Sequence, residues 1–157
     1  MSAEKALSDR SISLPEAPRA VGNYVTGLRV GDFFHVSGHI PPPGGGARTT
    51  GKVGKDLSAD EGYQAARSTG LSILATVRAA LGSLDRVQRV VKVAGLVNAT
   101  SDFTEHPRVL NGVSDLFVEV FGDAGRAVRS AVGAVSLPRD AAVEVEAIFL
   151  LVPDSLR

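Results

Sequence analysis

Hydrophobic residues along this chain recur with two periods, one typical of strands and one typical of helices. Residues 28–37 (LRVGDFFHVS) combine strand-prone bulk with a central Gly-Asp pair, which predicts two short strands joined by a turn. Residues 87–97 are rich in β-branched side chains and predict a longer strand. Two closing strands are expected over residues 127–136 and 143–152, with a turn at residues 137–140 between them.

Ser58 and Glu61 have the spacing of a capping box, so a helix is expected to begin there and to end near Gly82. Its apolar face is Ala66, Gly70, Ile73, Leu74, Val77 and Leu81. Gly70 in mid-helix costs about 1 kcal/mol relative to alanine, so we expect another element to pack closely against it.

A second helix is expected to begin near Pro107, because proline suits the first helical turn, and to end at Gly122. Its apolar stripe is Val109, Leu110, Val113, Phe117, Val120 and Phe121.

The order of elements is therefore strands, helix, strand, helix, strands, which indicates an α+β fold. Two helices cover only one face of such a sheet, so the other face needs a cover, and a neighbouring subunit is the simplest one. The last strand alternates over residues 143–146 and then becomes continuously apolar, which indicates that both of its faces are covered there. The PPPGGG run at residues 41–46 is expected to be a loop between strands, so residues 1–157 are predicted to form one domain.

Composition narrows the possible partners. Lys and Arg together number 17, as do Asp and Glu, and zero net charge argues against nucleic acid as the main partner. With no cysteine, disulfides and thiolate metal sites are excluded. The N-terminus lacks the apolar core of a secretory signal, and the longest apolar run (residues 147–152) is too short for a bilayer. A cytoplasmic protein without a membrane partner is expected.

Arg129 lies in an apolar strand, where an unpaired guanidinium is costly. It is predicted either to bind the carboxylate of a ligand or to pair with Glu144 or Glu146 at a strand edge. The turn at residues 137–140 is expected to bring Arg129 and Glu144 together across a hairpin. Glu144 and Glu146 share a strand face, which suits either a divided acid and base role or a solvated surface.

His35 and His39 are more consistent with structural histidines than with metal ligands, because no third ligand with suitable spacing is present, and no metal is expected. The glycines at residues 44–46 and 51–54 lack the strand and helix that flank a phosphate-binding loop.

Six segments resemble, in order and spacing, the reactive intermediate deaminase (Rid) family, also called the YjgF or endoribonuclease L-PSP family. They are VGNYV (21–25), VSGHIP (36–41), TGK (50–52), RSAV (129–132), LP (137–138) and VEVEA (143–147). The resemblance covers roughly residues 18–152 and leaves residues 1–17 as an N-terminal extension. A histidine at position 39, where glutamine is common, and a long 104–122 segment place the chain in a longer, less studied branch.

The resemblance implies a chorismate-mutase-like α+β fold, with two helices on one face of a mixed sheet, and a homotrimer with its sites in clefts between subunits. Arg129 matches the arginine that grips the substrate carboxylate, and Glu144 matches the glutamate that positions or activates water. Tyr24 matches a tyrosine that lines the cleft from the neighbouring subunit.

Four further residues are assigned to substrate binding by the same resemblance. Ser37 and Gly38 match a Ser-Gly pair whose backbone approaches the ligand. Ser130 and Ala131 follow the arginine, and the backbone carbonyl of Ala131 is expected to help hold water.

The implied activity is hydrolysis of small 2-imino or enamine acids to 2-keto acids and ammonia, with no cofactor. The expected partners are two further copies of the chain and a small carboxylate-bearing ligand. Two alternatives remain open: a trimer that binds carboxylates without catalysis, and an endoribonuclease.

Overall fold

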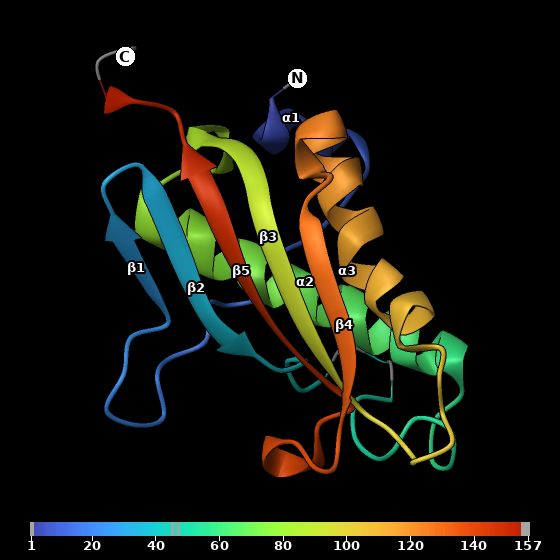
Figure 1. Cartoon of the computed structure of the whole chain (residues 1–157). Helices are drawn as coiled ribbons and strands as arrows, with labels where there is room; N and C mark the ends of the chain where they lie inside the picture. Colours follow the sequence, from blue (N-terminus) through green and yellow to red (C-terminus); the bar gives the residue numbers. More distant parts are fainter. Residues whose placement is uncertain (1, 45, 47, 155–157) are drawn as a thin grey trace.

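The computed structural model describes residues 2–44, 46 and 48–154. Its helices and strands are α1 (Ala3–Asp9), β1 (Gly27–Val30), β2 (Phe33–His39), α2 (Ala59–Leu81), β3 (Val87–Asn98), α3 (His106–Phe121), β4 (Val128–Ala134) and β5 (Val143–Leu151). Short 3-10 turns follow α2, α3 and β4. Figure 1 shows a single twisted sheet with α2 and α3 side by side behind it.

The sheet has the strand order β1-β2-β5-β3-β4, and only the β3–β4 pair is parallel. The predicted hairpin between β4 and β5 is therefore wrong, because β3 lies between them. Val93 of β3 pairs with Arg129 on one side and with Ala147 on the other. Parallel neighbours need a crossover connection, and α3 is that connection between β3 and β4. The 137–140 connection consequently passes over the end of β3.

The predicted helix boundaries are confirmed by the local chemistry at each end. Ser58 accepts a hydrogen bond from the Glu61 N–H at 3.1 Å, and Glu61 accepts one from the Ser58 N–H at 2.7 Å. Gly82 ends α2 with φ of +81°, a left-handed conformation that glycine adopts without strain. The close contact expected at Gly70 is also present, because a Cβ there would lie 2.8 Å from Leu116 Cδ2.

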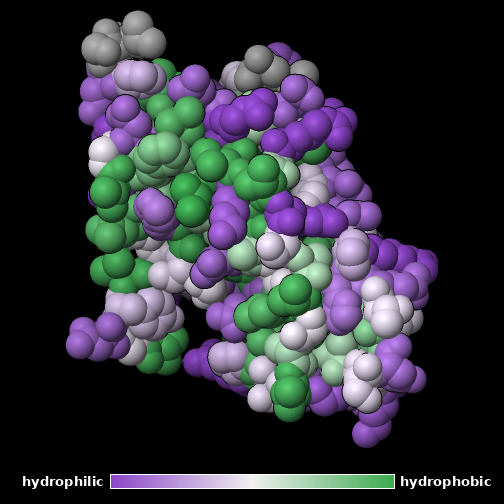
Figure 2. Space-filling model, viewed as in Figure 1, coloured by the Kyte–Doolittle hydropathy of each residue, from purple (hydrophilic) through white to green (hydrophobic). Residues whose placement is uncertain are grey.

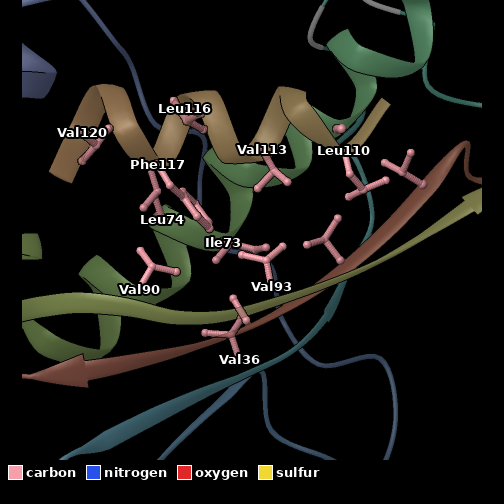
Figure 3. Close-up of a cluster of buried hydrophobic side chains, with 14 of the residues drawn as sticks. Val36, Ile73, Leu74, Val90, Val93, Leu110, Val113, Leu116, Phe117 and Val120 are labelled. Carbon is pink, nitrogen blue, oxygen red and sulfur yellow. The ribbon is translucent and has the colours of Figure 1, made fainter. Parts of the chain in front are cut away.

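The main core lies between the helix pair and the sheet. Figure 3 shows side chains of α2 and α3 pointing toward those of the strands, including Ile73, Leu74, Phe117, Val90 and Val93. The rings of Phe117 and Phe149 meet edge to face, with centroids 5.8 Å apart. α1 adds to the helix layer: Glu4 accepts a hydrogen bond from the Leu84 N–H at 2.9 Å and pairs with Arg78 at 3.1 Å. None of the helices among the described residues is both long and apolar enough to cross a membrane.

No helix among the described residues covers the opposite face of the sheet, and that face carries several exposed apolar side chains. Val128 and Val132 of β4 are 69% and 49% exposed, and Leu28 of β1 is 55% exposed. Figure 2, in the same view as Figure 1, shows hydrophobic surface gathered over the sheet. Ile148 and Leu150 of β5 remain partly exposed on this face, so the cover expected there does not come from the chain itself. We call this face the open face.

A prediction concerns Gly112, where α2 and α3 touch through their backbones. A Cβ on Gly112 would overlap the carbonyl oxygen of Tyr63 and lie 2.9 Å from the Arg67 nitrogen. Helix propensity alone predicts that Gly112→Ala stabilises the protein by about 1 kcal/mol. Because the overlap forces the helices apart, we expect instead a loss of about 1–3 kcal/mol in the free energy of unfolding, measured in urea.

The matched control is Gly22→Ala, because a Cβ there meets only the Tyr24 ring at ordinary contact distance, 3.6 Å. A stabilised Gly112→Ala variant would show that the two helices can separate at little cost.

Candidate functional site

A cleft of about 820 Å³ lies where β2 leaves the sheet and β5 enters it. Its walls come from segments far apart in the sequence: residues 15–19, Val21, Tyr24, Thr26, residues 38–43, Ser72, Pro138, Arg139 and Glu144. Tyr24, Gly38 and Glu144 thus meet in one cavity of a single chain, although Tyr24 was expected to enter the cleft from a neighbouring subunit.

Gly38 and Glu144 are in direct contact within this cleft. A Cβ on residue 38 would overlap Glu144 Oε1, so the carboxylate can occupy its position only because residue 38 lacks a side chain. The backbone at Ser37–Gly38 therefore lies against the carboxylate, and a small ligand held there would meet both.

Ser37 of β2 hydrogen-bonds to the segment at residues 25–26. Its N–H donates to the Thr26 carbonyl at 3.0 Å, and its hydroxyl donates to the Val25 carbonyl at 2.5 Å. These bonds fix the chain next to Tyr24, whose side chain is 50% exposed. Tyr24 also lines a second cleft of about 440 Å³ on the open face, together with Ser37, Lys92 and Glu146. Its ring therefore lies between the two cavities.

Burial and the adjacent negative charge of Glu146 raise the pKa of Glu144 above its ordinary value, burial being the larger cause. A carboxylate with a raised pKa is a stronger base once ionised. It therefore suits the removal of a proton from a water molecule better than a fully solvated glutamate.

A buried polar network holds the 137–140 connection, which contributes Pro138 and Arg139 to the cleft. Asn98, 1% exposed, donates to Asp140 Oδ1 at 3.2 Å and accepts from Lys52 Nζ at 2.8 Å. Arg139 and Asp140 both have left-handed backbone conformations, with φ of +56° and +55°. Such strain persists only where neighbouring contacts fix the chain, and the bond from Asn98 to Asp140 is such a contact.

Arg129 does not reach Glu144 or Glu146 within the chain. Register places Glu144 level with Leu96 and Val132 on the open face. Arg129 instead bonds to α3 on the other face of the sheet. Its Nη1 donates to Asn111 Oδ1 at 2.9 Å and to Ser114 Oγ at 3.0 Å. Its Nη2 donates to the Pro107 carbonyl at 3.4 Å. The predicted pairing with a β5 glutamate is therefore wrong.

The residues after Arg129 divide between the two faces of the edge strand β4. Ser130 pairs with Ala94, which pairs in turn with Glu146, so Ser130 lies on the open face in the same row as Glu146. Ala131 lies on the helix side and packs against the core.

Asn111 and Ser114 are contacts of Arg129 that the sequence interpretation missed. They are three residues apart, so both project from the same side of α3 toward β4. The available signal was two polar residues at helical spacing on a mostly apolar helix. Without knowing that β4 pairs with β3, nothing linked them to Arg129.

The histidines are separated from one another. His39 is 4% exposed and lies against α2, His35 is exposed on the open face, and His106 stacks edge-on against Phe103 at 5.3 Å. Among the described residues, no three His, Cys, Asp or Glu side chains come close enough to hold a metal ion.

Comparison with known proteins identifies the family. Residues 4–149 match the model described as "YjgF/chorismate_mutase-like, putative endoribonuclease". This chain belongs to the YjgF family. The family resemblance inferred from the sequence is thereby confirmed, as is the chorismate-mutase-like fold, which in the described part of the chain has a mixed five-stranded sheet and three α-helices.

Several known proteins are similar to this YjgF-family chain over most of their length. Protein TCP17 of Trypanosoma cruzi is 46% identical over 141 residues, covering 89% of this chain and 88% of its own. The 2-iminobutanoate/2-iminopropanoate deaminase of Salmonella typhimurium is 34% identical, covering 88% of this chain and 95% of its own. A crystal structure of a protein of unknown function from Agrobacterium tumefaciens superimposes with a TM-score of 0.87 at 38% identity, covering 96% and 92% of the two chains.

The raised pKa of Glu144 predicts a pH-dependent effect on stability for this YjgF-family chain. Because the folded-state pKa lies above the unfolded one, ionisation of Glu144 opposes folding as the pH rises through it. We therefore expect the difference in free energy of unfolding, Glu144→Gln minus wild type, to increase as the pH rises above about 4.3, the ordinary glutamate pKa.

Chemical denaturation at several pH values measures this difference. In a Glu146→Gln background the increase should be smaller, because one of the two causes of the raised pKa is removed. A difference independent of pH would contradict the burial of Glu144.

Proposed function

We propose that this chain hydrolyses small 2-imino acids and their enamine tautomers to 2-keto acids and ammonia. The observation that carries the proposal is the partly buried Glu144 carboxylate, which lies against the Gly38 backbone in a cleft open to small molecules. The Salmonella relative is named as such a deaminase, which supports the proposal. The name of TCP17, which is more similar to this chain, does not specify an activity.

The reaction needs an oriented imine and a held water. Water adds through its oxygen to the imine carbon while Glu144 accepts one proton from the water and passes it to the imine nitrogen. In the resulting tetrahedral adduct, Glu144 transfers the remaining hydroxyl proton to the nitrogen, so ammonia leaves and the keto group remains. A well-placed general base contributes about 10²–10⁴-fold to the rate, and the imine is already electrophilic. Side chains, backbone and water therefore suffice for the chemistry.

Arg129 is proposed to bind the substrate carboxylate. Its three bonds to α3 all run from the two terminal guanidinium nitrogens and hold the head group in place. The guanidinium has five N–H donors, so those not used in these bonds can donate to a ligand carboxylate. A fixed guanidinium orients a carboxylate without a large loss of side-chain entropy on binding.

The site is proposed to form between subunits of a homotrimer. Arg129 and Glu144 lie on opposite faces of the sheet and are separated by β3, so one chain cannot bring both to the same substrate. The open face carries exposed Val128, Val132 and Leu28, and a surface of this kind is typical of an interface. A neighbouring copy packed there would bring the Arg129 edge of one chain to the Glu144 cleft of the next.

Replacement of Arg129 tests the activity directly. 2-Aminoacrylate is generated from serine by a pyridoxal-phosphate dehydratase, and its decay to pyruvate is followed with and without the protein. We expect wild type to accelerate the decay and Arg129→Ala to lose the acceleration, because the carboxylate is no longer held. Arg126→Ala is the matched control, since Arg126 pairs with Asp123 in its own turn, at 3.1 Å. Equal rates for wild type and Arg129→Ala would rule out catalysis by this site.

Mixing two inactive variants tests the shared cleft. If Arg129 and Glu144 act from different chains, mixed oligomers of Arg129→Ala and Glu144→Gln contain some clefts with both native residues. Random assembly should restore about a quarter of the wild-type activity. Mixtures that remain inactive although mass spectrometry shows mixed oligomers would place both residues in one chain's site.

The two other functions predict different results. A carboxylate-binding protein without catalysis would be stabilised by 2-keto acids yet leave imine decay unchanged. An endoribonuclease would cleave RNA even after Arg129→Ala. The equal numbers of acidic and basic residues do not favour an RNA groove.

A further inference from the structure

Strand β2 carries one extra residue just before it reaches the cleft. Val36 pairs with Ala147 and His39 pairs with Val145, so three steps along β2 correspond to two along β5. This is a β-bulge, and it reverses the alternation of side chains. Without the bulge, residue 39 would face the opposite side from Val36. With it, both side chains face the helices.

His39 occupies the position that the bulge creates. It is 4% exposed and bonds through both ring nitrogens: Nδ1 lies 2.7 Å from the Ser37 carbonyl oxygen, and Nε2 lies 2.8 Å from Thr76 Oγ1 of α2. A carbonyl can only accept, so Nδ1 carries the proton, and Nε2 of the neutral ring accepts a hydrogen bond from the Thr76 hydroxyl. Burial lowers the pKa of His39, against the opposing effect of the Ser37 backbone bond, which agrees with a neutral ring.

The imidazole therefore links α2 to the bulge. Ser37 is held from the other side by the Thr26 and Val25 carbonyls, at 3.0 and 2.5 Å. Between these attachments lies Gly38, whose backbone contacts the Glu144 carboxylate. The position of Gly38 relative to Glu144 thus depends on how firmly the bulge is fixed.

We propose that His39 and Thr76 form a positioning pair, which sets the distance between the Gly38 backbone and the Glu144 carboxylate for the reaction. This inference rests on the proposed imine hydrolysis. His39 touches neither the reacting carbon nor the water in this scheme, and it acts through Ser37 and Gly38. Thr76 is 4% exposed in the interior of α2, so its hydroxyl serves the imidazole rather than solvent.

Thr76→Val tests the pair with little change in shape. The variant leaves Nε2 without its donor and frees the ring to change tautomer or tilt. We expect kcat for 2-aminoacrylate to fall about 10-fold with a smaller change in KM, because catalytic geometry is lost more than substrate binding. Thr76→Ser keeps the hydroxyl and should recover kcat to within about twofold of wild type.

Thr69→Val is the matched control. Thr69 is also buried in α2, but its hydroxyl donates to the Ala65 carbonyl of its own helix at 2.9 Å. Thr69→Val should therefore lose some thermal stability while keeping its kcat. Equal kcat losses in the two valine variants, or no recovery in Thr76→Ser, would overturn the positioning role.

A measurement independent of turnover separates this inference from the proposed function. The ¹⁵N spectrum of His39 should show the Nδ1–H tautomer in wild type and a changed pattern in Thr76→Val. The ¹³C titration of the Glu144 carboxyl should shift in Thr76→Val and stay unchanged in Thr69→Val. If wild type hydrolyses no imine but these shifts are seen, imine hydrolysis is wrong and the structural coupling stands. If Glu144 titrates identically in all variants, the coupling is wrong whatever the activity.

Discussion

Strand β3 bonds to β5 along one edge and to β4 along the other, and α3 forms the crossover that the parallel β3–β4 pairing requires. This arrangement decides where the chemistry lies. It moves Arg129 to the sheet edge farthest from β1, where α3 holds its guanidinium, and it leaves Glu144 on β5, two strands away from the edge strand β4. A chain whose β4 and β5 formed a simple hairpin would have both groups on neighbouring strands. Here Arg129 and Glu144 are kept apart within the chain. They can act on one substrate only if two chains associate.

Features set by neighbouring residues could be predicted from the sequence. The start of α2 depends on Ser58 and Glu61 and its end on Gly82, all within a few residues of the boundary. The hairpin of β1 and β2 around Gly31 is equally local. These elements are therefore present close to their expected positions, and the stripe of α3 is buried as its spacing predicts.

Features set by pairing between distant segments could not be predicted. The pairing of β4 with β3 rather than with β5 depends on α3 packing across the sheet. No short stretch of the sequence predicts this pairing. The bulge before His39 is similar: a period of two along β2 places His39 on the wrong face, and only the register with Val145 corrects it. The contacts of Arg129 with Asn111 and Ser114 depend on the pairing of β4 with β3 and on the position of α3, which explains why the sequence suggested a glutamate partner instead.

The outer wall of the cleft, residues 15–19 and Val21, is attached at both of its ends. On one side, α1 is fastened to the helix layer through Glu4, and Arg10 donates to the Glu119 carbonyl at 3.2 Å. On the other, Val25 and Thr26 are bonded to Ser37 of β2. The two attachments, at Arg10 and Val25, leave residues 11–24 between them as a strap without regular structure along the cleft. Exchange of side chains along this strap would alter the width of the cleft while leaving the sheet behind it unchanged.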